Sequence, residues 1–292
     1  MSLALAVVIA AAVAAPGMLR AETITVGGKG FTEQLLMAEM TKQLLEANGF
    51  DVEKADGMGT NVVRSALENG AVDLYWEYTG TSLVTFNKVK DRLTPEETYA
   101  RVKELDGEKG LVWLAPSSAN NTYALAIKPG DATTDGMVNL SDMAAAYNGG
   151  EDILMATTAE FPRREDGLIG LQEVYGFKAG RANIKPMDGG LVFNALDNGN
   201  VNIAVVAATD GRISKMGLKL LADDKNFFPN YALVPVVRAD TLEKHPELKP
   251  LLESLSGRLD DSTMQTLNGQ VDVDGRSVED VARSFLQEAG LV

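Results

Sequence analysis

The sequence predicts an α/β fold of two similar lobes that face each other across a ligand-binding cleft. The first observation is a short apolar strand that runs into a loop crowded with aromatic, carboxylate and hydroxyl side chains, residues 73–81. The second is an internal repeat, in which residues 63–74 are echoed without a gap by residues 192–203. Each copy has the pattern of an amphipathic helix, a glycine C-cap and the start of a strand. The cleft is expected where the strand ends of the two copies meet, because ligands bind past the carboxyl ends of strands in such sheets.

The loop at residues 73–81 supplies the first candidate site residues. Glu77, Tyr78 and Thr81 fall just past the predicted strand end. The alternative interpretation is that the aromatics of this segment are simply core residues. The existence of a second copy of the same unit favours a site.

The spacing of the repeat also aligns Ile24 with Ile153, each of which opens an apolar strand. The loop after the first of these strands carries Lys29, and the loop after the second carries Arg164. A lysine just before a helix N-terminus and an arginine at a strand end both favour a bound carboxylate. For Lys29 the alternative is a solvated loop lysine.

Composition excludes several classes of function. The 292 residues are 45% hydrophobic and 23% charged, which is ordinary for a globular chain large enough for two cores. The absence of cysteine excludes a cysteine nucleophile and thiolate metal sites, and a single histidine leaves little room for a catalytic triad or a histidine metal cluster. A formal net charge of −14 argues against nucleic acid as a partner. We therefore expect no cofactor, no metal and no enzymatic activity.

The N-terminus has the pattern of a secretory signal. Residues 3–15 form an apolar run that is too short to span a bilayer, followed by small residues and a Pro-Gly break. Cleavage is expected after Ala21, although the usual positively charged start is missing. The sequence thus predicts an exported, periplasmic protein.

The remaining elements follow in order along the chain. Strands are expected at residues 24–26, 72–75, 111–114, 124–127, 153–157 and 232–237. Helices are expected from a cap at Thr32 to 48–49, from the capping box at 94–97 to 109–110, and from a cap at Ser141. Further helices are expected from Thr241 onward, with the last one beginning near Ser277. The C-terminal helices should pack on the first lobe. This predicts a signal peptide at 1–21, a first lobe at 22–125 and 232–292, and a second lobe at 126–231.

Six motifs in this order give the chain a family resemblance that extends from Ile24 to Leu291. They are Gly-Gly-Lys-x-Phe-Thr-Glu-Gln, Asp-Leu-Tyr-x-Glu-Tyr-Thr-Gly-Thr, Asn-Asn-Thr-Tyr-Ala-Leu-Ala, Glu-Phe-x-x-Arg-x-Asp-Gly, Thr-Asp-Gly-Arg-Ile and Tyr-x-x-x-Pro-Val-Val-Arg. The chain resembles the substrate-binding component of osmoprotectant ABC importers, which capture glycine betaine, choline, carnitine and related quaternary amines. The resemblance implies a type II periplasmic-binding-protein fold, with two crossing strands, and a membrane permease as partner of a monomeric binding protein.

The resemblance also implies roles for six residues. Tyr78, Tyr123 and Tyr231 are expected to be walls of an aromatic cage, because a quaternary ammonium has no N–H to donate and is held by ring faces. The ligand's anionic or polar end is expected to be held by Lys29, Thr81 and Arg164.

One position departs from the family pattern. The family often has a further tyrosine shortly before the Thr-Asp-Gly motif, where this chain has Ala207, the repeat partner of Tyr78. The loss weakens trimethylammonium binding, makes room for a bulkier ligand, or is compensated by Trp76, which stands where the family usually has proline. The sequence leaves these three alternatives open.

Two other functions are alternatives to a transport protein. One is a sensing module that presents its closed lobes to a membrane receptor; neighbouring permease and ATPase genes would argue against it. The other is an enzyme on the same fold, for which the sequence offers no nucleophile–base pair.

Overall fold

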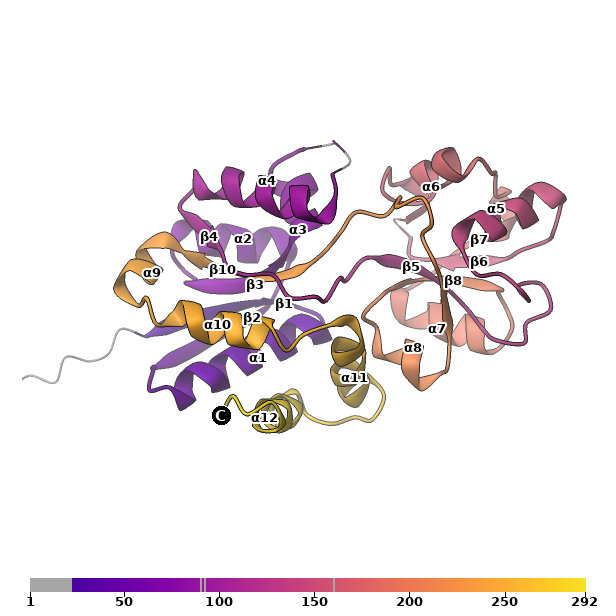
Figure 1. The fold of residues 1–292 in the computed structure, drawn as a ribbon. Coiled ribbons are helices and arrows are strands. Elements are labelled where there is room, and N and C mark those ends of the chain that lie inside the picture. Colours follow the sequence, from indigo (N-terminus) through magenta and orange to yellow (C-terminus); the bar gives the residue numbers. More distant parts are fainter. Residues whose placement is uncertain (1–22, 90, 92, 160) are drawn as a thin grey trace, which may run out of the picture.

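The framework of the molecule consists of two mixed five-stranded sheets, one in each lobe (Figure 1). The computed structural model describes residues 23–292 except 90, 92 and 160, so the predicted signal peptide lies outside the described residues. Among the described residues, no helix has the length and apolar character that crossing a membrane requires.

The first sheet has the strand order β2-β1-β3-β10-β4. Its strands are β1 (Ile24–Lys29), β2 (Val52–Met58), β3 (Leu74–Tyr78), β4 (Leu111–Trp113) and β10 (Leu233–Arg238). β1 runs parallel to β2 and β3, whereas β10 is antiparallel to β3 and β4.

The second sheet has the order β7-β6-β8-β5-β9. Its strands are β5 (Tyr123–Ile127), β6 (Met155–Thr157), β7 (Ile184–Pro186), β8 (Ile203–Ala207) and β9 (Lys219–Leu221). The antiparallel strand is β5, which pairs with β8 and β9. In each lobe the antiparallel strand is the first strand after the chain crosses from the other lobe: β5 in the second lobe and β10 in the first.

The structure confirms the internal repeat. The repeat spacing aligns β3 with β8 residue for residue, and the helix α2 (Thr60–Asn69) with α7 (Gly189–Asp197). A helix, a glycine with positive φ (Gly70 and Gly199) and a strand thus recur at the same place in both sheets.

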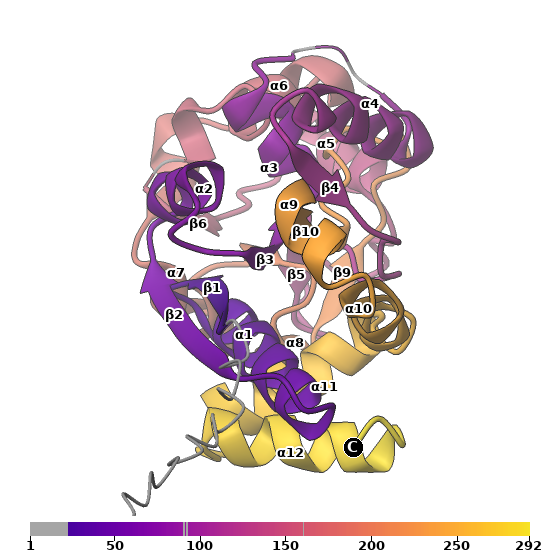
Figure 2. The same cartoon turned by 90° about the vertical axis from the view of Figure 1, so that its left-hand side faces the viewer.

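Helices cover both faces of each sheet (Figures 1 and 2). In the first lobe α2 and α4 (Pro95–Gly107) cover one face, and the other face is covered by α1 (Thr32–Ala47), α10 (Leu248–Ser256), α11 (Asp261–Asp272) and α12 (Val278–Glu288). In the second lobe α5 (Leu140–Gly149) and α6 (Leu168–Tyr175) lie opposite α7 and α8 (Gly211–Lys215). Shorter elements are α3 (Thr79–Thr81), a π-helix (Ser82–Phe86), two 3-10 helices (Phe161–Arg163 and Arg181–Asn183) and α9 (Ala239–Lys244).

The crossing segments differ slightly from the prediction. The boundary expected between residues 125 and 126 falls inside β5, whose register with β8 begins at Tyr123, so the whole strand belongs to the second sheet. The two crossing segments run side by side, since Asn120 and Ala232 form an antiparallel bridge between them. Both approach the cleft that the lobes share.

The C-terminal helices do more than cover the first lobe. α10 and α12 pack on α1 as expected, but α11 also packs on α8 of the second lobe. Gly211 and Gly269 permit this close approach, because a Cβ on Gly211 would come within 2.1 Å of the Gly269 nitrogen. α11 is therefore a second connection between the lobes.

Two predicted helix caps are wrong and one is confirmed. The Thr94 capping box is present. Thr32 is not a cap: the N-cap residue is Phe31, and the Thr32 hydroxyl donates to Asp272 instead. The helix expected from Ser141 is capped by Asn139, while the Ser141 hydroxyl donates to Asp224.

Candidate ligand-binding site

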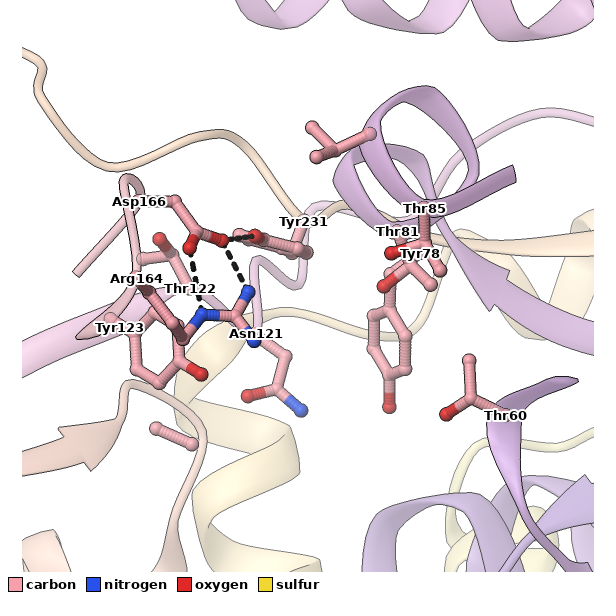
Figure 3. Close-up of a pocket in the computed structure, with 12 residues that line it drawn as sticks. Thr60, Tyr78, Thr81, Thr85, Asn121, Thr122, Tyr123, Arg164, Asp166 and Tyr231 are labelled. Carbon is pink, nitrogen blue, oxygen red and sulfur yellow. Dashed lines mark hydrogen bonds and ion pairs between the residues drawn. The ribbon is translucent and has the colours of Figure 1, made fainter. Parts of the chain in front are cut away.

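The cleft contains a cavity of about 310 Å³ with walls from both lobes and from the crossing segments (Figure 3). The first lobe contributes Thr60, Tyr78, Thr81, Val84 and Thr85. The crossing segments contribute Asn121, Thr122 and Tyr231. The second lobe contributes Tyr123, Arg164, Asp166 and Ala207. Five of the six predicted site residues thus line one cavity, and Lys29 does not.

Tyr78 is the last residue of β3, at the carboxyl end of a central strand. Its hydroxyl donates to Glu33 Oε1 at 2.7 Å, and its ring stacks with that of Phe31 at a centroid distance of 6.2 Å. Burial, together with the neighbouring charge of Glu33, raises the pKa of Tyr78 well above its ordinary value. The ring is therefore a neutral, firmly held wall.

Tyr123 opens β5 on the opposite side of the cavity, as Figure 3 shows. Its ring meets Phe161 edge-on at 5.4 Å, and the Arg164 guanidinium carbon lies 5.7 Å from its ring centroid. Ala207 is its cross-strand partner in β8. Ala207 itself lines the cavity, so a ring at position 207 would stand in this wall next to Tyr123.

Tyr231 comes from the second crossing segment. Its backbone N–H donates to Asn120 Oδ1 at 2.7 Å, and its hydroxyl donates to Asp166 Oδ2 at 3.1 Å. Gly80 makes room for the ring, since a Cβ there would lie 2.8 Å from a ring carbon of Tyr231. The Tyr-Thr-Gly-Thr motif thus needs glycine at this position, because a larger residue would clash with the Tyr231 ring.

Arg164 reaches the cavity but is held by a carboxylate. Its Nε and Nη2 donate to the two oxygens of Asp166 at 2.7 and 2.5 Å. Burial alone would raise the pKa of Asp166, but the hydrogen bonds and charge of Arg164 outweigh it and keep that pKa low. The cavity wall therefore contains one fixed positive and one fixed negative charge.

Lys29 lies away from the cavity wall, next to Tyr78. Its ammonium is 2.5 Å from Glu77 Oε1 and 4.8 Å from the centroid of the Tyr78 ring. Glu77 also accepts from the Tyr75 hydroxyl and the Tyr78 backbone N–H. The prediction that Glu77 and Tyr78 follow the strand end is wrong, because β3 continues through both residues and buries them.

Trp76 does not compensate for Ala207. Strand alternation directs its indole toward α1, where Nε1 donates to Thr41 Oγ1 at 2.9 Å, and its side chain is fully buried in the core of the first lobe. This removes one of the three alternatives for the missing ring.

Several lining residues were not predicted. Asn121, Thr122 and Asp166 lie inside the motifs that carry the resemblance, although the resemblance gives them no role. Thr60 opens α2 after β2, a strand that the sequence pattern did not reveal. Thr85 lies in the π-helix, which has no clear sequence signal.

The family model for the substrate-binding domain of ABC-type glycine betaine transport systems matches residues 22–288. The chain belongs to this family. The Glycine-betaine-binding protein of Pseudomonas aeruginosa is 42% identical over 284 residues, covering 95% of this chain and 91% of the relative. The glycine betaine-binding protein YehZ of Escherichia coli K12 is 33% identical over 292 residues, covering 97% and 95%. A solved glycine betaine/carnitine/choline ABC transporter structure aligns with a TM-score of 0.84 at 27% identity, covering 92% and 99%.

Family membership confirms the expected class of protein. The chain is a non-enzymatic substrate-binding protein of an ABC importer, of an extracytoplasmic family, with the two-lobed type II fold. The resemblance deduced from the six motifs was therefore correct.

Proposed function

We propose that this protein captures a quaternary-ammonium compatible solute of the glycine betaine type and delivers it to a membrane permease. The observation that carries the proposal is that Tyr78, Tyr123 and Tyr231 line one cavity together with Arg164. These rings come from both lobes and from a crossing segment, so a ligand bound among them contacts both lobes and the connection between them. Export by the segment 1–21 and action as a monomer complete the proposal.

The chemistry of the walls suits such a ligand. A methylated ammonium is attracted to ring faces, by up to about 2 kcal/mol or more for a desolvated ring. A carboxylate at the other end of the ligand can share the Arg164 guanidinium with Asp166 and accept from the Thr81 hydroxyl. A direct contact between Lys29 and the ligand stays a prediction, since it requires the ammonium to leave Glu77.

Isothermal titration calorimetry is expected to show tighter binding of glycine betaine than of choline. Choline keeps the cation but has no carboxylate, so it forgoes a charge-assisted hydrogen bond of about 1.5–3 kcal/mol, which corresponds to roughly tenfold or more in affinity. Arg164→Met should reduce or reverse this preference, because it removes the donor and leaves the Asp166 charge in the wall. Choline binding much tighter than glycine betaine, or a simple amino acid binding tighter than both, contradicts the ligand class.

Ligand binding should also bring the lobes together. Contacts on both lobes give the closed arrangement the higher affinity, so saturation shifts the population toward it. Small-angle scattering should show the radius of gyration falling when glycine betaine is added. A scattering profile that stays the same at saturation would mean that the crossing segments and the α8–α11 contact hold the lobes fixed.

A further inference from the structure

Glu33 is a buried carboxylate at the site that the binding chemistry above leaves without a role. It lies in the first turn of α1, and its side chain is 3% exposed. A buried charge is costly unless it is paired or fully hydrogen-bonded. The hydrogen-bond partners of Glu33 therefore indicate its role.

Two of those partners are walls of the cavity. The Tyr78 hydroxyl donates to Glu33 Oε1 at 2.7 Å, and Asn121 Nδ2 donates to the same oxygen at 3.0 Å. Tyr78 belongs to the first sheet and Asn121 to a crossing segment. One oxygen atom thus fixes two wall residues from different parts of the chain.

The other oxygen leads to the second lobe. Asn268 of α11 donates from Nδ2 to Glu33 Oε2 at 3.2 Å, and also to the Thr209 carbonyl at 2.9 Å. Thr209 follows β8, two residues after the wall residue Ala207. The carboxylate therefore connects the walls of the first lobe to the strand end of the second.

The groups around Glu33 are donors that suit both oxygens of a carboxylate. Tyr78, Asn121 and Asn268 all act as donors, and the N-terminal turn of α1 favours negative charge. Burial raises the pKa of Glu33 above its ordinary value, and hydrogen bonds from Thr209, Tyr78, Asn268 and Asn121 offset only part of that rise. An amide in its place would direct an N–H₂ group toward at least one of these donors.

We propose that Glu33 is a positioning residue for ligand binding, which fixes the Tyr78 and Asn121 walls and links them through Asn268 to the second lobe. The proposal deepens the proposed function and rests on it. The competing view is that Glu33 is a core carboxylate whose loss affects stability alone.

Calorimetry with glycine betaine on Glu33→Gln, Tyr78→Phe and the double variant separates these views. Each single variant is expected to weaken binding about tenfold, since Tyr78→Phe removes this hydrogen bond and Glu33→Gln replaces its carboxylate acceptor by an amide. The affinity of the double variant for glycine betaine should be at most about twofold below that of the single variant that binds less tightly. Losses that multiply to about a hundredfold would show that Glu33 does not act through the Tyr78 hydroxyl, and would overturn the proposal.

Glu39→Gln is the matched control. Glu39 is a second buried carboxylate on α1, paired with Lys54 at 2.8 Å and outside the cavity lining. Its loss should lower stability and leave affinity unchanged. Equal affinity losses in Glu39→Gln and Glu33→Gln would assign the effect to general destabilisation and overturn the proposal.

Asn268→Ala keeps the test valid if circular dichroism shows that Glu33→Gln does not fold. Asn268 is outside the cavity lining, so a severalfold loss of affinity supports the link between the lobes, and unchanged affinity overturns it. Failure of the unsubstituted protein to bind glycine betaine or any other quaternary amine would overturn both the function and this role. If the unsubstituted protein binds glycine betaine and Glu33→Gln binds it with the same affinity, only the role of Glu33 is overturned.

Discussion

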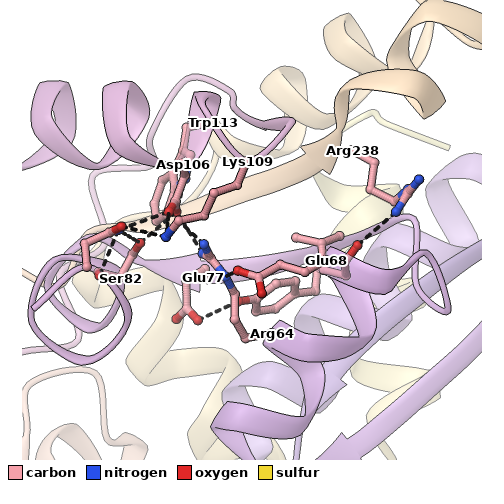
Figure 4. A network of polar contacts seen from close by, with 11 residues as sticks. Arg64, Glu68, Glu77, Ser82, Asp106, Lys109, Trp113 and Arg238 are labelled. Carbon is pink, nitrogen blue, oxygen red and sulfur yellow. Dashed lines mark hydrogen bonds and ion pairs between the residues drawn. The ribbon is translucent and has the colours of Figure 1, made fainter.

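Replacing Asp106 by alanine is expected to lower the free energy of unfolding by about 3–5 kcal/mol, the usual cost of leaving a buried charge without its partner. Asp106 is fully buried on α4 and accepts two hydrogen bonds from Arg64, at 2.7 and 2.8 Å (Figure 4). Ser82 and Trp113 donate to it as well, at 2.7 and 2.9 Å. Removing the carboxylate leaves Ser82, Trp113 and two N–H groups of Arg64 without this acceptor in the core.

Urea denaturation of Asp106→Ala and Glu68→Ala tests this expectation. Glu68 pairs with the same Arg64 at 2.6 Å but is 42% exposed, so its loss should cost at most about 1 kcal/mol. Similar losses in the two variants would contradict the assignment. The network also holds the chain that forms a cavity wall, because Ser82 directly follows Thr81. Asp106→Ala should therefore weaken ligand binding in addition.

The same network sets a pH dependence. Burial alone would raise the pKa of Asp106, but the hydrogen bonds and charge of Arg64 hold it far below its usual range. A lowered pKa means that the stabilisation is complete above the unfolded value of about 3.9 and is lost as the pH falls through the folded pKa. Stability measured from pH 5 to pH 2 should thus fall less steeply in Asp106→Asn than in the unsubstituted protein.

The sequence predicted the parts of this molecule that repeat or that lie at strand ends. The helix–glycine–strand unit recurs residue for residue in β3 and β8, so the pattern located both halves of the cleft. The sequence also predicted the three tyrosines that line the cavity, because each lies in one of the six ordered motifs: Tyr78, Tyr123 and Tyr231.

Ion pairing was beyond prediction, because it depends on which side chains meet in space. Lys29 appeared available to a ligand in the sequence, yet Glu77 lies 48 positions away and meets it through the pairing of β1 with β3. Arg164, by contrast, pairs with Asp166 only two residues along, inside a turn in which the Gly167 N–H donates to the Arg164 carbonyl at 3.2 Å. The charges were identified correctly, but not what neutralises them.

Ala207→Tyr is the second large effect, because it adds the ring that the resemblance leads us to expect at this position. Ala207 lines the cavity and lies opposite Tyr123, so the Cβ atoms of the pair are about 4.5–5.5 Å apart and a new ring stands beside an existing wall. If the missing ring is a missing cage wall, affinity for glycine betaine should rise by up to roughly tenfold, or ~1.4 kcal/mol. Ala207→Leu is the control, since it adds bulk without a ring face and should give no such gain.

The opposite sign is expected if the gap accommodates a larger natural ligand. The new ring would then overfill the cavity and weaken binding of that ligand by ~1–3 kcal/mol. Titrating Ala207→Tyr with glycine betaine and with carnitine distinguishes the two cases, because a cage wall strengthens the smaller ligand while an occupied gap weakens the larger one. An unchanged affinity for both would mean that position 207 does not contact the ligand, and would place the bound ammonium nearer to Tyr78 and Tyr231 than to the Tyr123 wall.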